Sequence, residues 1–409
     1  MLQFFFILAC LLIPLGLGVQ EKRIQQQRLA TIPTRILVNG IRGKSTVTRF
    51  ITSILKEAGV HVVGKTTGSA ARMIYWDQQE EEILYRPPSG PNINEQKAVV
   101  RKATARHAQA LVSECMAVDP DYQRVLQRDL IRANIVVIVN VLEDHLDVMG
   151  PTLENIAEAF AQTIPYRGTL IVPSDDFTPF FQKICRRRKT RLIVANESLV
   201  PQGYLDQFNY LVFPQNVALA LGVARALGLS EELALAAMLK AAPDPGAAEV
   251  LKVLNFSENV FFVNGFAVND AASTLAMFDY LKQLGYPTEN TTFLMNCRKD
   301  RVDRTLQFAH AVLPKLHGGK IIAMGQMTGP IAEAFEQGDY PIDTFVNMED
   351  QPVFEIMDEL RTQPANSLIF TMGNIHGDAE ALLDEINALS VPSSLKFSTP
   401  GGAFDDLIL

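Results

Sequence analysis

Residues 35–46 read Arg35-Ile36-Leu37-Val38-Asn39-Gly40-Ile41-Arg42-Gly43-Lys44-Ser45-Thr46. A short apolar run ends at Gly40, the chain turns at Gly43, and a helix-like segment follows. Glycines let backbone N–H groups approach an anion, the start of a helix adds partial positive charge, Lys44 supplies a cation and Ser45 a ligand for Mg²⁺. The stretch therefore predicts a strand, a phosphate-binding loop (P-loop) and a helix.

The spelling of this loop departs from the usual G-x-x-x-x-G-K-[ST] pattern. Val38 stands where the first glycine belongs, and the glycine comes two residues later, at Gly40. An ordinary strand-to-helix turn followed by a surface lysine would give the same residues. The apolar run before the loop and the helical pattern of residues 47–58 after it favour the phosphate site.

Length and composition limit the classes of protein. The chain has 409 residues, 48% of them hydrophobic, and a net charge of −8. This length exceeds one ordinary core and predicts two globular domains. An acidic balance without a basic stripe gives no support for a nucleic-acid partner. Four cysteines lie far apart without C-x-x-C spacing, so we expect reduced thiols and neither a zinc site nor disulfides.

The N-terminal residues 2–19 are uncharged and almost entirely apolar. As a helix they would cover roughly 27 Å, enough for the hydrocarbon core of a membrane. No basic region precedes them and no A-x-A site follows, so we expect a single-pass membrane anchor rather than a cleaved signal. Lys22, Arg23 and Arg28 come next, and the positive-inside tendency places the N-terminus outside and the rest of the chain in the cytoplasm. A buried N-terminal helix is the alternative.

Short apolar runs and helical stretches alternate after the loop, which predicts an α/β fold with a mostly parallel sheet covered on both faces. The expected strands are residues 61–63, 110–113, 135–141, 169–172 and 192–195. The expected helices are residues 153–163, 177–188 and 216–227.

Pro243-Asp244-Pro245-Gly246 interrupts this pattern and is the best candidate for a hinge. A second doubly wound, Rossmann-like α/β set follows, with strands near residues 260–264, 292–295, 320–324 and 367–371. We therefore expect an anchor at 1–20, a linker at 21–34, a P-loop domain at 35–246, a second α/β domain at 247–396 and a tail at 397–409.

Polar residues follow two expected strands of the first domain, at the edge where parallel sheets hold ligands. Glu114 comes just past one strand, and hard oxygen ligands suit Mg²⁺, so Glu114 and Ser45 could share an ion. Asn140-Val141-Leu142-Glu143-Asp144-His145-Leu146-Asp147 follows another. The carboxylates around His145 favour a metal or acid–base role over a structural histidine. A surface glutamate at a strand end is the alternative for Glu114.

Three loops of the second domain also follow expected strands. Residues 296–304 carry charges of both signs, and residues 373–377 place a histidine between two glycines. Each is equally well read as a solvated loop or as part of a site that faces the P-loop across the hinge. Asn269 and Asp270 could meet nucleotide or substrate, although Asp270 as a helix cap is an equally good explanation.

The order of these motifs resembles a known superfamily. V-N-G-I-R-G-K-S-T, S-E-C, N-V-L-E-D-H-L-D-V-M-G and P-Q-N-V-A-L-A-L-G-V-A are similar to the ATP-dependent Mur ligases and folylpolyglutamate synthetases. The segments T-T-G-S-A-A-R-M-I-Y-W-D, G-P-N-I-N-E-Q-K, E-C-M-A-V-D-P-D-Y-Q and N-G-F-A-V-N-D-A-A-S-T-L narrow the resemblance to the ligase subunits of bacterial poly-γ-glutamate synthases. The resemblance covers essentially the whole chain, including the anchor.

The resemblance implies roles for particular residues. The nucleotide-binding residues that it implies, with ATP and Mg²⁺ as cofactors, are Gly40, Arg42, Gly43, Lys44, Ser45, Thr46 and Asn216. It implies Ser45 and Glu114 as ligands of one Mg²⁺ and His145 as a ligand of a second. Lys44, Glu114 and His145 are implied as catalytic residues. Asp300 and Arg301, also as catalytic residues, and His376, as a cofactor-binding residue, match elements of the second domain more loosely.

Three positions depart from the Mur pattern. Phe160 stands where Mur enzymes carry a carbamylated lysine, Ala247 faces their hinge arginine, and Gly265 faces the aspartate of their D-Y-A-H element. Carbamate support and the standard nucleotide clamp are therefore in doubt for this chain, and Asn269 or Asp270 are candidates to substitute.

The activity that the resemblance implies is ATP-dependent amide formation, adding glutamate to a growing poly-γ-glutamate chain through an acyl phosphate. The partners it implies are the integral-membrane subunits of the synthase, and homo-oligomerisation stays open. An ATPase subunit that powers polymer export without forming a bond is the competing hypothesis. The charged loops of the second domain favour the ligase, and the intact Lys44-Ser45 argues against a silent scaffold.

Overall fold

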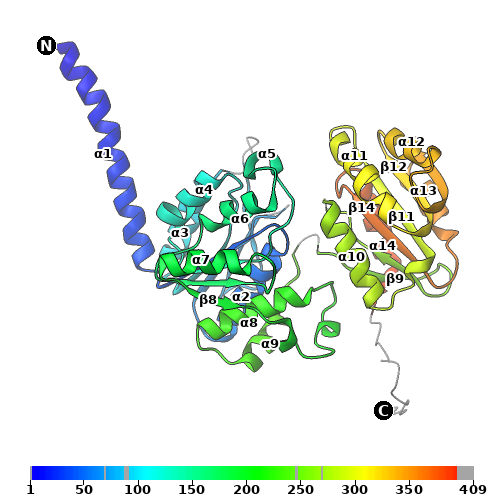
Figure 1. Ribbon diagram of the computed structural model, residues 1–409, viewed down its shortest axis with the longest axis horizontal. Coiled ribbons are helices and arrows are strands. Elements are labelled where there is room, and N and C mark those ends of the chain that lie inside the picture. Colours follow the sequence, from blue (N-terminus) through cyan, green and yellow to red (C-terminus); the bar gives the residue numbers. More distant parts are fainter. Residues whose placement is uncertain (1, 69–70, 87–91, 245–246, 269, 394–409) are drawn as a thin grey trace. The chain divides into compact units, whose positions relative to one another are not determined.

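The computed structural model describes residues 2–68, 71–86, 92–244, 247–268 and 270–393. The chain forms two compact units (Figure 1). Unit 1 contains residues 1–202 and 212–245, and unit 2 contains residues 203–211 and 246–409. Asn269, the last two residues of the expected hinge and the expected tail at 397–409 lie outside the described residues.

Unit 1 is built on an eight-stranded sheet with the order β4-β3-β2-β5-β1-β6-β7-β8. Six strands from β2 to β8 are parallel, and β3 and β4 form an antiparallel edge. The strands are β1 Thr34–Asn39, β2 Val62–Lys65, β3 Arg72–Tyr75, β4 Glu82–Ile83, β5 Ala110–Glu114, β6 Ile135–Ile138, β7 Thr169–Val172 and β8 Arg191–Val194. β1, which leads into the P-loop, is central.

Helices cover both faces of this sheet. Helix α2 (Lys44–Glu57) packs with α8 (Pro214–Ala226) and α9 (Glu231–Met238) on one face. The other face carries α3 Glu95–Ala105, α4 Pro120–Val125, the π-helix η1 Leu126–Ile131, α5 Leu146–Met149, α6 Leu153–Ala161 and α7 Thr178–Arg188.

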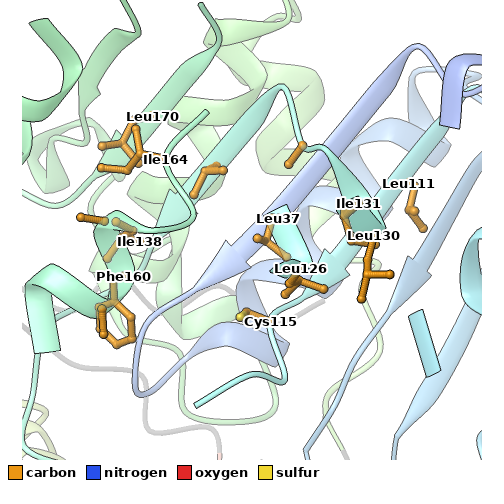
Figure 2. Close-up of a cluster of buried hydrophobic side chains, with 14 of the residues drawn as sticks. Leu37, Leu111, Cys115, Leu126, Leu130, Ile131, Ile138, Phe160, Ile164 and Leu170 are labelled. Atoms are coloured by element: carbon orange, nitrogen blue, oxygen red, sulfur yellow. The ribbon is translucent and has the colours of Figure 1, made fainter. Parts of the chain in front are cut away.

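An apolar cluster fills the space between the sheet and this second set of helices (Figure 2). Leu37 and Leu111 of neighbouring strands meet Leu126 and Leu130 of η1 there, and all four are nearly or fully buried. Because side chains alternate along a strand, Val38 and Val112 face α2 instead and are also fully buried. Each such side chain contributes about 1.5–3 kcal/mol of burial free energy, which fixes β1 and hence the loop after it.

Helix α1 spans Leu2–Ala30, so it continues past the apolar segment into residues that the sequence assigns to a linker. Within the described part of the chain, one helix, Gln3–Ala30, is long and apolar enough to cross a membrane. The last turns of α1 pack on unit 1: Leu29 is 2% exposed, and Gln25 donates a hydrogen bond to the carbonyl of Leu130. The apolar first part is exposed at Phe4, Phe5, Phe6, Ile7, Leu12, Ile13, Leu15 and Leu17.

Unit 2 has a seven-stranded sheet with the order β13-β12-β11-β14-β10-β9-β15. Its strands are β9 Val250–Val253, β10 Val260–Val263, β11 Thr291–Cys297, β12 Gly318–Gly325, β13 Ile342–Glu349, β14 Ser367–Gly373 and β15 Ser390–Pro392. The strands from β13 to β10 are parallel, and β9 and β15 are antiparallel. Its helices are α10 Ala271–Gln283, α11 Val302–Ala311, α12 Gly329–Glu336, α13 Val353–Arg361 and α14 Asp378–Ala388.

The expectation of an α/β chain with two sheets is confirmed. Strand β6 ends at Ile138, three residues before the expected end, because Asn140 turns toward the P-loop. The antiparallel edge strands β3, β4, β9 and β15 and the outer strand β13 were not predicted from the sequence.

Candidate active site

The loop between β1 and α2 has backbone angles that only glycine adopts easily. Gly40 has φ +124° and Gly43 has φ +86°. A Cβ atom on Gly40 would lie 2.9 Å from the backbone nitrogen of Val139, and one on Gly43 would lie 2.6 Å from Oδ1 of Asn216. Both positions therefore require glycine. Gly43 directly precedes the first turn of α2, whose partial positive charge favours an anion.

Asn140, just past the end of β6, fastens this loop. Its Oδ1 accepts hydrogen bonds from the backbone N–H groups of Ile41 and Arg42, each at 3.1 Å, and its Nδ2 donates to the carbonyl of Arg42 at 3.0 Å. From the sequence, Asn140 was one of several polar residues after an expected strand and had no role of its own. The signal for its role is that it lies just past β6, the strand paired with β1.

Lys44 folds over the same loop. Its Nζ donates to the carbonyls of Gly40 and Ile41 at 2.8 and 2.7 Å. Burial lowers the pKa of Lys44, and the nearby carboxylate of Glu114 opposes that change. The ammonium group is thus held at the loop where a phosphate would need a cation.

Ser45 and Glu114 meet, although 69 residues separate them. The Ser45 hydroxyl donates to Oε2 of Glu114 at 2.9 Å, and the backbone N–H of Thr67 donates to the same oxygen at 2.7 Å. Glu114 is only 2% exposed. The contact arises because β5 is hydrogen-bonded in parallel to β1, so both strands end at one edge of the sheet.

The residues at this edge fit a Mg²⁺ ion. A hydroxyl and a carboxylate beside a phosphate-binding loop are hard oxygen ligands, and Mg²⁺ is usually held by one or two carboxylates together with phosphate oxygens and water. In the described part of the chain, three or more His, Cys, Asp or Glu side chains never gather closely enough to form a protein-only metal site. Ser45 and Glu114 are therefore suited to a metal ion that arrives with a nucleotide.

Three more expected nucleotide-binding residues lie at or beside the loop. Asn216, in the first turn of α8, is 7% exposed, and its amide stands against Gly43. The guanidinium of Arg42 lies 3.6 Å from Oδ2 of Asp144 in an ion pair. Thr46 lies in the first turn of α2. The structure thus brings the expected nucleotide-binding residues of unit 1 to one strand edge.

His145 differs from these residues. It precedes the short helix α5 with φ +50°, a left-handed conformation, and about half of its side chain is exposed. Its Nε2 lies 3.8 Å from Oδ1 of Asp144. No described set of three His, Cys, Asp or Glu ligands contains it, so its role as a ligand of a second metal ion rests on the resemblance alone.

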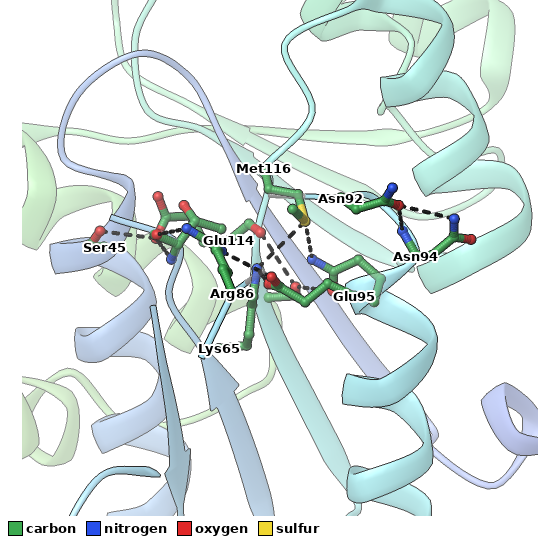
Figure 3. Close-up of polar contacts among 11 residues, drawn as sticks. Ser45, Lys65, Arg86, Asn92, Asn94, Glu95, Glu114 and Met116 are labelled. Carbon is green, nitrogen blue, oxygen red and sulfur yellow. Dashed lines mark hydrogen bonds and ion pairs between the residues drawn. The ribbon is translucent and has the colours of Figure 1, made fainter. Parts of the chain in front are cut away.

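A buried ion cluster adjoins Glu114 (Figure 3). Lys65, fully buried at the end of β2, lies 2.8 Å from Oε1 of Glu95, and Arg86 donates to the other oxygen of Glu95 at 3.0 Å. Arg86 also donates to the carbonyl of Thr67, whose N–H reaches Glu114. Although burial raises it, hydrogen bonds and ion pairs with Arg86 and Lys65 hold the pKa of Glu95 below its usual value. Sequence reasoning did not anticipate this cluster.

The candidate residues of unit 2 lie mainly at the surface. Asp300 is exposed and pairs with Arg298 at 2.7 Å, and the exposed Arg301 directly precedes α11. Nδ1 of His376 lies 2.6 Å from Glu380 in the first turn of α14. Asp270 caps α10, since its Oδ1 accepts from the N–H of Ser273 at 2.9 Å. Asn269 lies outside the described residues.

Two asparagines hold the His376 loop in place: Asn296 near the end of β11 and Asn374 directly after β14. Nδ2 of Asn296 donates to the carbonyls of Asn374 and His376 at 2.6 and 3.0 Å. Asn374 returns a hydrogen bond to the Asn296 carbonyl at 3.1 Å and accepts one from Arg304 at 2.7 Å. Arg304, one turn beyond Arg301, is thus the arginine of α11 that reaches the loop. The sequence signal for Arg304 was its place in the first turn of the helix that follows β11.

Two departures from the Mur pattern have structural explanations. Phe160 is 2% exposed within the apolar cluster of unit 1, where a lysine would be buried among hydrocarbon. A Cβ on Gly265 would lie 2.2 Å from the carbonyl oxygen of Thr371, so this backbone leaves no room for an aspartate. Both positions exclude the Mur side chain on packing grounds.

Family models match both units. Residues 38–200 match the Mur ligase middle domain, and residues 250–389 match the poly-gamma-glutamate synthase CapB C-terminal domain. Among solved structures, a bifunctional folylpolyglutamate synthase/dihydrofolate synthase from Yersinia pestis, in complex with AMPPNP and a Mn ion, is similar at a TM-score of 0.62. That likeness covers 90% of this chain and 93% of that one at 13% identity, and it concerns the fold alone.

Similarity to curated proteins extends over nearly the whole sequence. The PGA synthase CapB of Bacillus subtilis (strain 168) is 52% identical over 385 residues, which cover 94% of this chain and 98% of that protein. The capsule biosynthesis protein CapB of Bacillus anthracis is 48% identical over 387 residues, covering 94% of this chain and 83% of that protein. The chain therefore belongs to the poly-γ-glutamate synthase CapB family and is an ATP-dependent ligase.

Proposed function

We propose that this chain extends poly-γ-glutamate by forming an amide bond to an incoming glutamate through an acyl phosphate. The contact between Ser45 and Glu114 beside the P-loop carries the proposal, because it supplies hard oxygen ligands where the γ-phosphate of ATP would lie. The 52% identity to a PGA synthase supports the choice of polymer.

The reaction has two steps. An oxygen of the acceptor's terminal γ-carboxylate attacks the γ-phosphorus of ATP, the bond from that phosphorus to the bridging oxygen breaks, and ADP leaves. The amine of the incoming glutamate then attacks the acyl carbon, the bond to the phosphate oxygen breaks, and phosphate is released while the amine loses a proton to solvent. Excluding water protects the acyl phosphate from hydrolysis between the steps.

The residues of unit 1 act on the phosphates in this proposal. Backbone N–H groups of the loop from Gly40 to Thr46 cradle them, Lys44 balances the charge that develops during transfer, and Asn216 contacts the nucleotide. Ser45 and Glu114 would hold a Mg²⁺ ion, and we assign His145 to a second. When bound, Mg²⁺ neutralises phosphate charge and orients the γ-phosphoryl group.

Unit 2 is proposed to bind the incoming glutamate. Asp300, Arg301 and His376 remain candidates, and Asp270 stays a candidate near the nucleotide. We add Arg304, because it is partly buried and hydrogen-bonded to the Asn374 side chain at the carboxyl end of β14. A guanidinium at that place suits the α-carboxylate of an amino acid.

The apolar part of α1 is proposed to anchor the enzyme in the cell membrane, with both units in the cytoplasm. Lys22, Arg23 and Arg28, which follow the apolar segment, support that orientation. Integral-membrane subunits of a synthase complex are the partners that we propose for this anchor.

An isotope experiment tests the acyl phosphate. Poly-γ-glutamate labelled with ¹⁸O in its terminal carboxylate should transfer label to the released phosphate during turnover, and hydroxylamine should trap a hydroxamate. The variants Lys44→Ala and Glu114→Gln should give neither product while keeping the circular dichroism spectrum of the wild type. An ATPase that only powers export would release phosphate without label, and that result under conditions of polymer synthesis would exclude the mechanism.

A further inference from the structure

An ion triad joins the P-loop helix to the start of the expected hinge. Arg49 lies four residues after Ser45 on α2, so both side chains emerge from the same face of the helix. The Arg49 side chain is only 3% exposed. Its Nε donates to Oδ1 of Asp244 at 3.3 Å, and its Nη2 donates to Oε2 of Glu81 at 2.9 Å.

The charges of this triad do not balance. One guanidinium faces two carboxylates, and both carboxylate side chains are only about one-fifth exposed. Glu114 adds a further negative charge near Asp244, and Lys44 and Lys65 are the cations that act on Glu114. The triad itself keeps one more negative than positive charge, and excess negative charge in a buried place is costly unless a cation joins it.

Oδ2 of Asp244, which does not bond Arg49, faces the same glycine, Gly68, as the hydroxyl group of Ser45. A Cβ on Gly68 would stand 3.3 Å from Oδ2 of Asp244 and 3.6 Å from the hydroxyl oxygen of Ser45. Gly68 thus occupies a narrow gap between Asp244 and Ser45, and its missing side chain leaves that gap open.

The acidity of Asp244 reflects the same surroundings. Burial raises the pKa of its carboxyl group to about 6; Arg49 opposes this rise, and the negative charges of Glu114 and Glu81 add to it. A cation near Ser45 and Glu114 would offset the negative charge of the two carboxylates on that side, Asp244 and Glu114.

We propose that Asp244 is a positioning residue for the nucleotide-bound divalent cation, accepting a hydrogen bond from a water molecule on the ion that Ser45 and Glu114 hold. Mg²⁺ usually keeps several of its waters, and carboxylates outside the direct ligands commonly orient them. The inference rests on the proposed function of Ser45 and Glu114 as metal ligands.

Metal binding can be measured directly, without turnover. Mn²⁺ is titrated into the full-length enzyme with the non-hydrolysable analogue AMPPNP, and free Mn²⁺ is followed by electron paramagnetic resonance. Asp244→Asn keeps the shape of the side chain and removes its charge, and it should weaken Mn²⁺ binding about 10-fold or more. Gly68→Ala should weaken it as well, because its Cβ would enter the gap between Asp244 and Ser45.

Glu81→Gln is the matched control, because it removes a charge from the same guanidinium without facing Gly68. It should change Mn²⁺ affinity less than about 2-fold. Equal weakening by Glu81→Gln and Asp244→Asn would show that the effect passes through Arg49 and would overturn the inference. Unchanged affinity in Asp244→Asn would overturn it too.

Glu114→Gln separates this inference from the proposed function. If Glu114→Gln binds Mn²⁺ like the wild type, the proposed metal site is wrong. If Glu114→Gln loses the metal ion while Asp244→Asn keeps it fully, the metal site stands and only the role of Asp244 falls. Thermal unfolding of each variant reports whether unit 1 is still folded.

Discussion

Single side chains connect the P-loop to strands that lie far away in the sequence. Asn140 supplies three hydrogen bonds to residues 41 and 42, and Glu114 accepts one from Ser45. Neither the contact of Asn140 with the P-loop nor that of Glu114 with Ser45 is visible as a local sequence motif. Both follow from a sheet in which β5 and β6 flank β1, so that the ends of three strands meet.

Replacing Asn140 should weaken nucleotide binding. Asn140→Ala removes three hydrogen bonds that hold the loop, each worth about 1 kcal/mol, so AMPPNP affinity should fall at least about 10-fold by isothermal titration calorimetry. Asn134→Ala is the control, because Asn134 bonds Arg35 and Pro33 in the same way at the opposite end of β1. It should lower the melting temperature and leave affinity unchanged. Equal losses of affinity in both variants would refute the role of Asn140.

Phe160 leads to a prediction about carbon dioxide. Because this side chain is packed in the apolar cluster where Mur enzymes carry a carbamylated lysine, no carbamate can form at the position. Polymer synthesis in buffer stripped of CO₂ should proceed at the normal rate, and adding bicarbonate should not raise it. A marked rescue by bicarbonate would point to carbamylation of another lysine.

Among the elements, α2 packs closely on the sheet at Gly64 of β2. A Cβ on Gly64 of β2 would lie 2.6 Å from Oγ1 and 2.9 Å from Cγ2 of Thr52. Thr52 lies within α2, is β-branched, and donates a hydrogen bond from its hydroxyl group to the carbonyl of Thr48. Its side chain therefore cannot easily adopt another rotamer. The glycine therefore sets the distance at which α2, with Ser45 and Arg49, sits over the strands.

Gly64→Ala should destabilise unit 1 by about 1–3 kcal/mol through overpacking. The measurement is chemical denaturation followed by circular dichroism. The double variant Thr52→Ala/Gly64→Ala should recover much of the loss, because the two atoms nearest the new methyl group are removed. Additive losses in the double variant would mean that the contact between α2 and β2 is not the cause.

The predictability of the elements depended on their burial. Interior strands such as β7 and β14 are almost entirely buried and mostly apolar, and their positions were predicted closely. Strands β4 and β15 are two or three residues long and largely exposed, so they carry no periodic signal. That Ser45 and Glu114 lie close enough to share an ion was predicted from strand ends, and the structure shows a direct hydrogen bond between them. Asp244 and Arg304 were missed as site residues because their partners are set by packing between distant segments.

At the scale of the molecule, α1 is both the proposed membrane anchor and part of unit 1. Its apolar first half is exposed, whereas its last turns carry buried contacts. Lys22 pairs with Asp129 at 3.0 Å, and Glu21 pairs with Lys97 at 2.8 Å. The helix is therefore a stiff connection from the proposed membrane segment to the unit that holds the P-loop, in place of a flexible tether.

Two truncations distinguish these halves. A chain that begins at residue 21 keeps Gln25, Leu29 and Ile32, so unit 1 should melt at nearly the full-length temperature but no longer sediment with membranes. A chain that begins at residue 33 loses the buried Leu29 and Ile32, which contribute about 1.5–3 kcal/mol each, and should melt at least about 5 °C lower. Equal melting temperatures for the two truncations would show that the end of α1 is not part of the core. Membrane sedimentation of the chain that begins at residue 21 would show that surfaces beyond the apolar segment also hold the enzyme at the membrane.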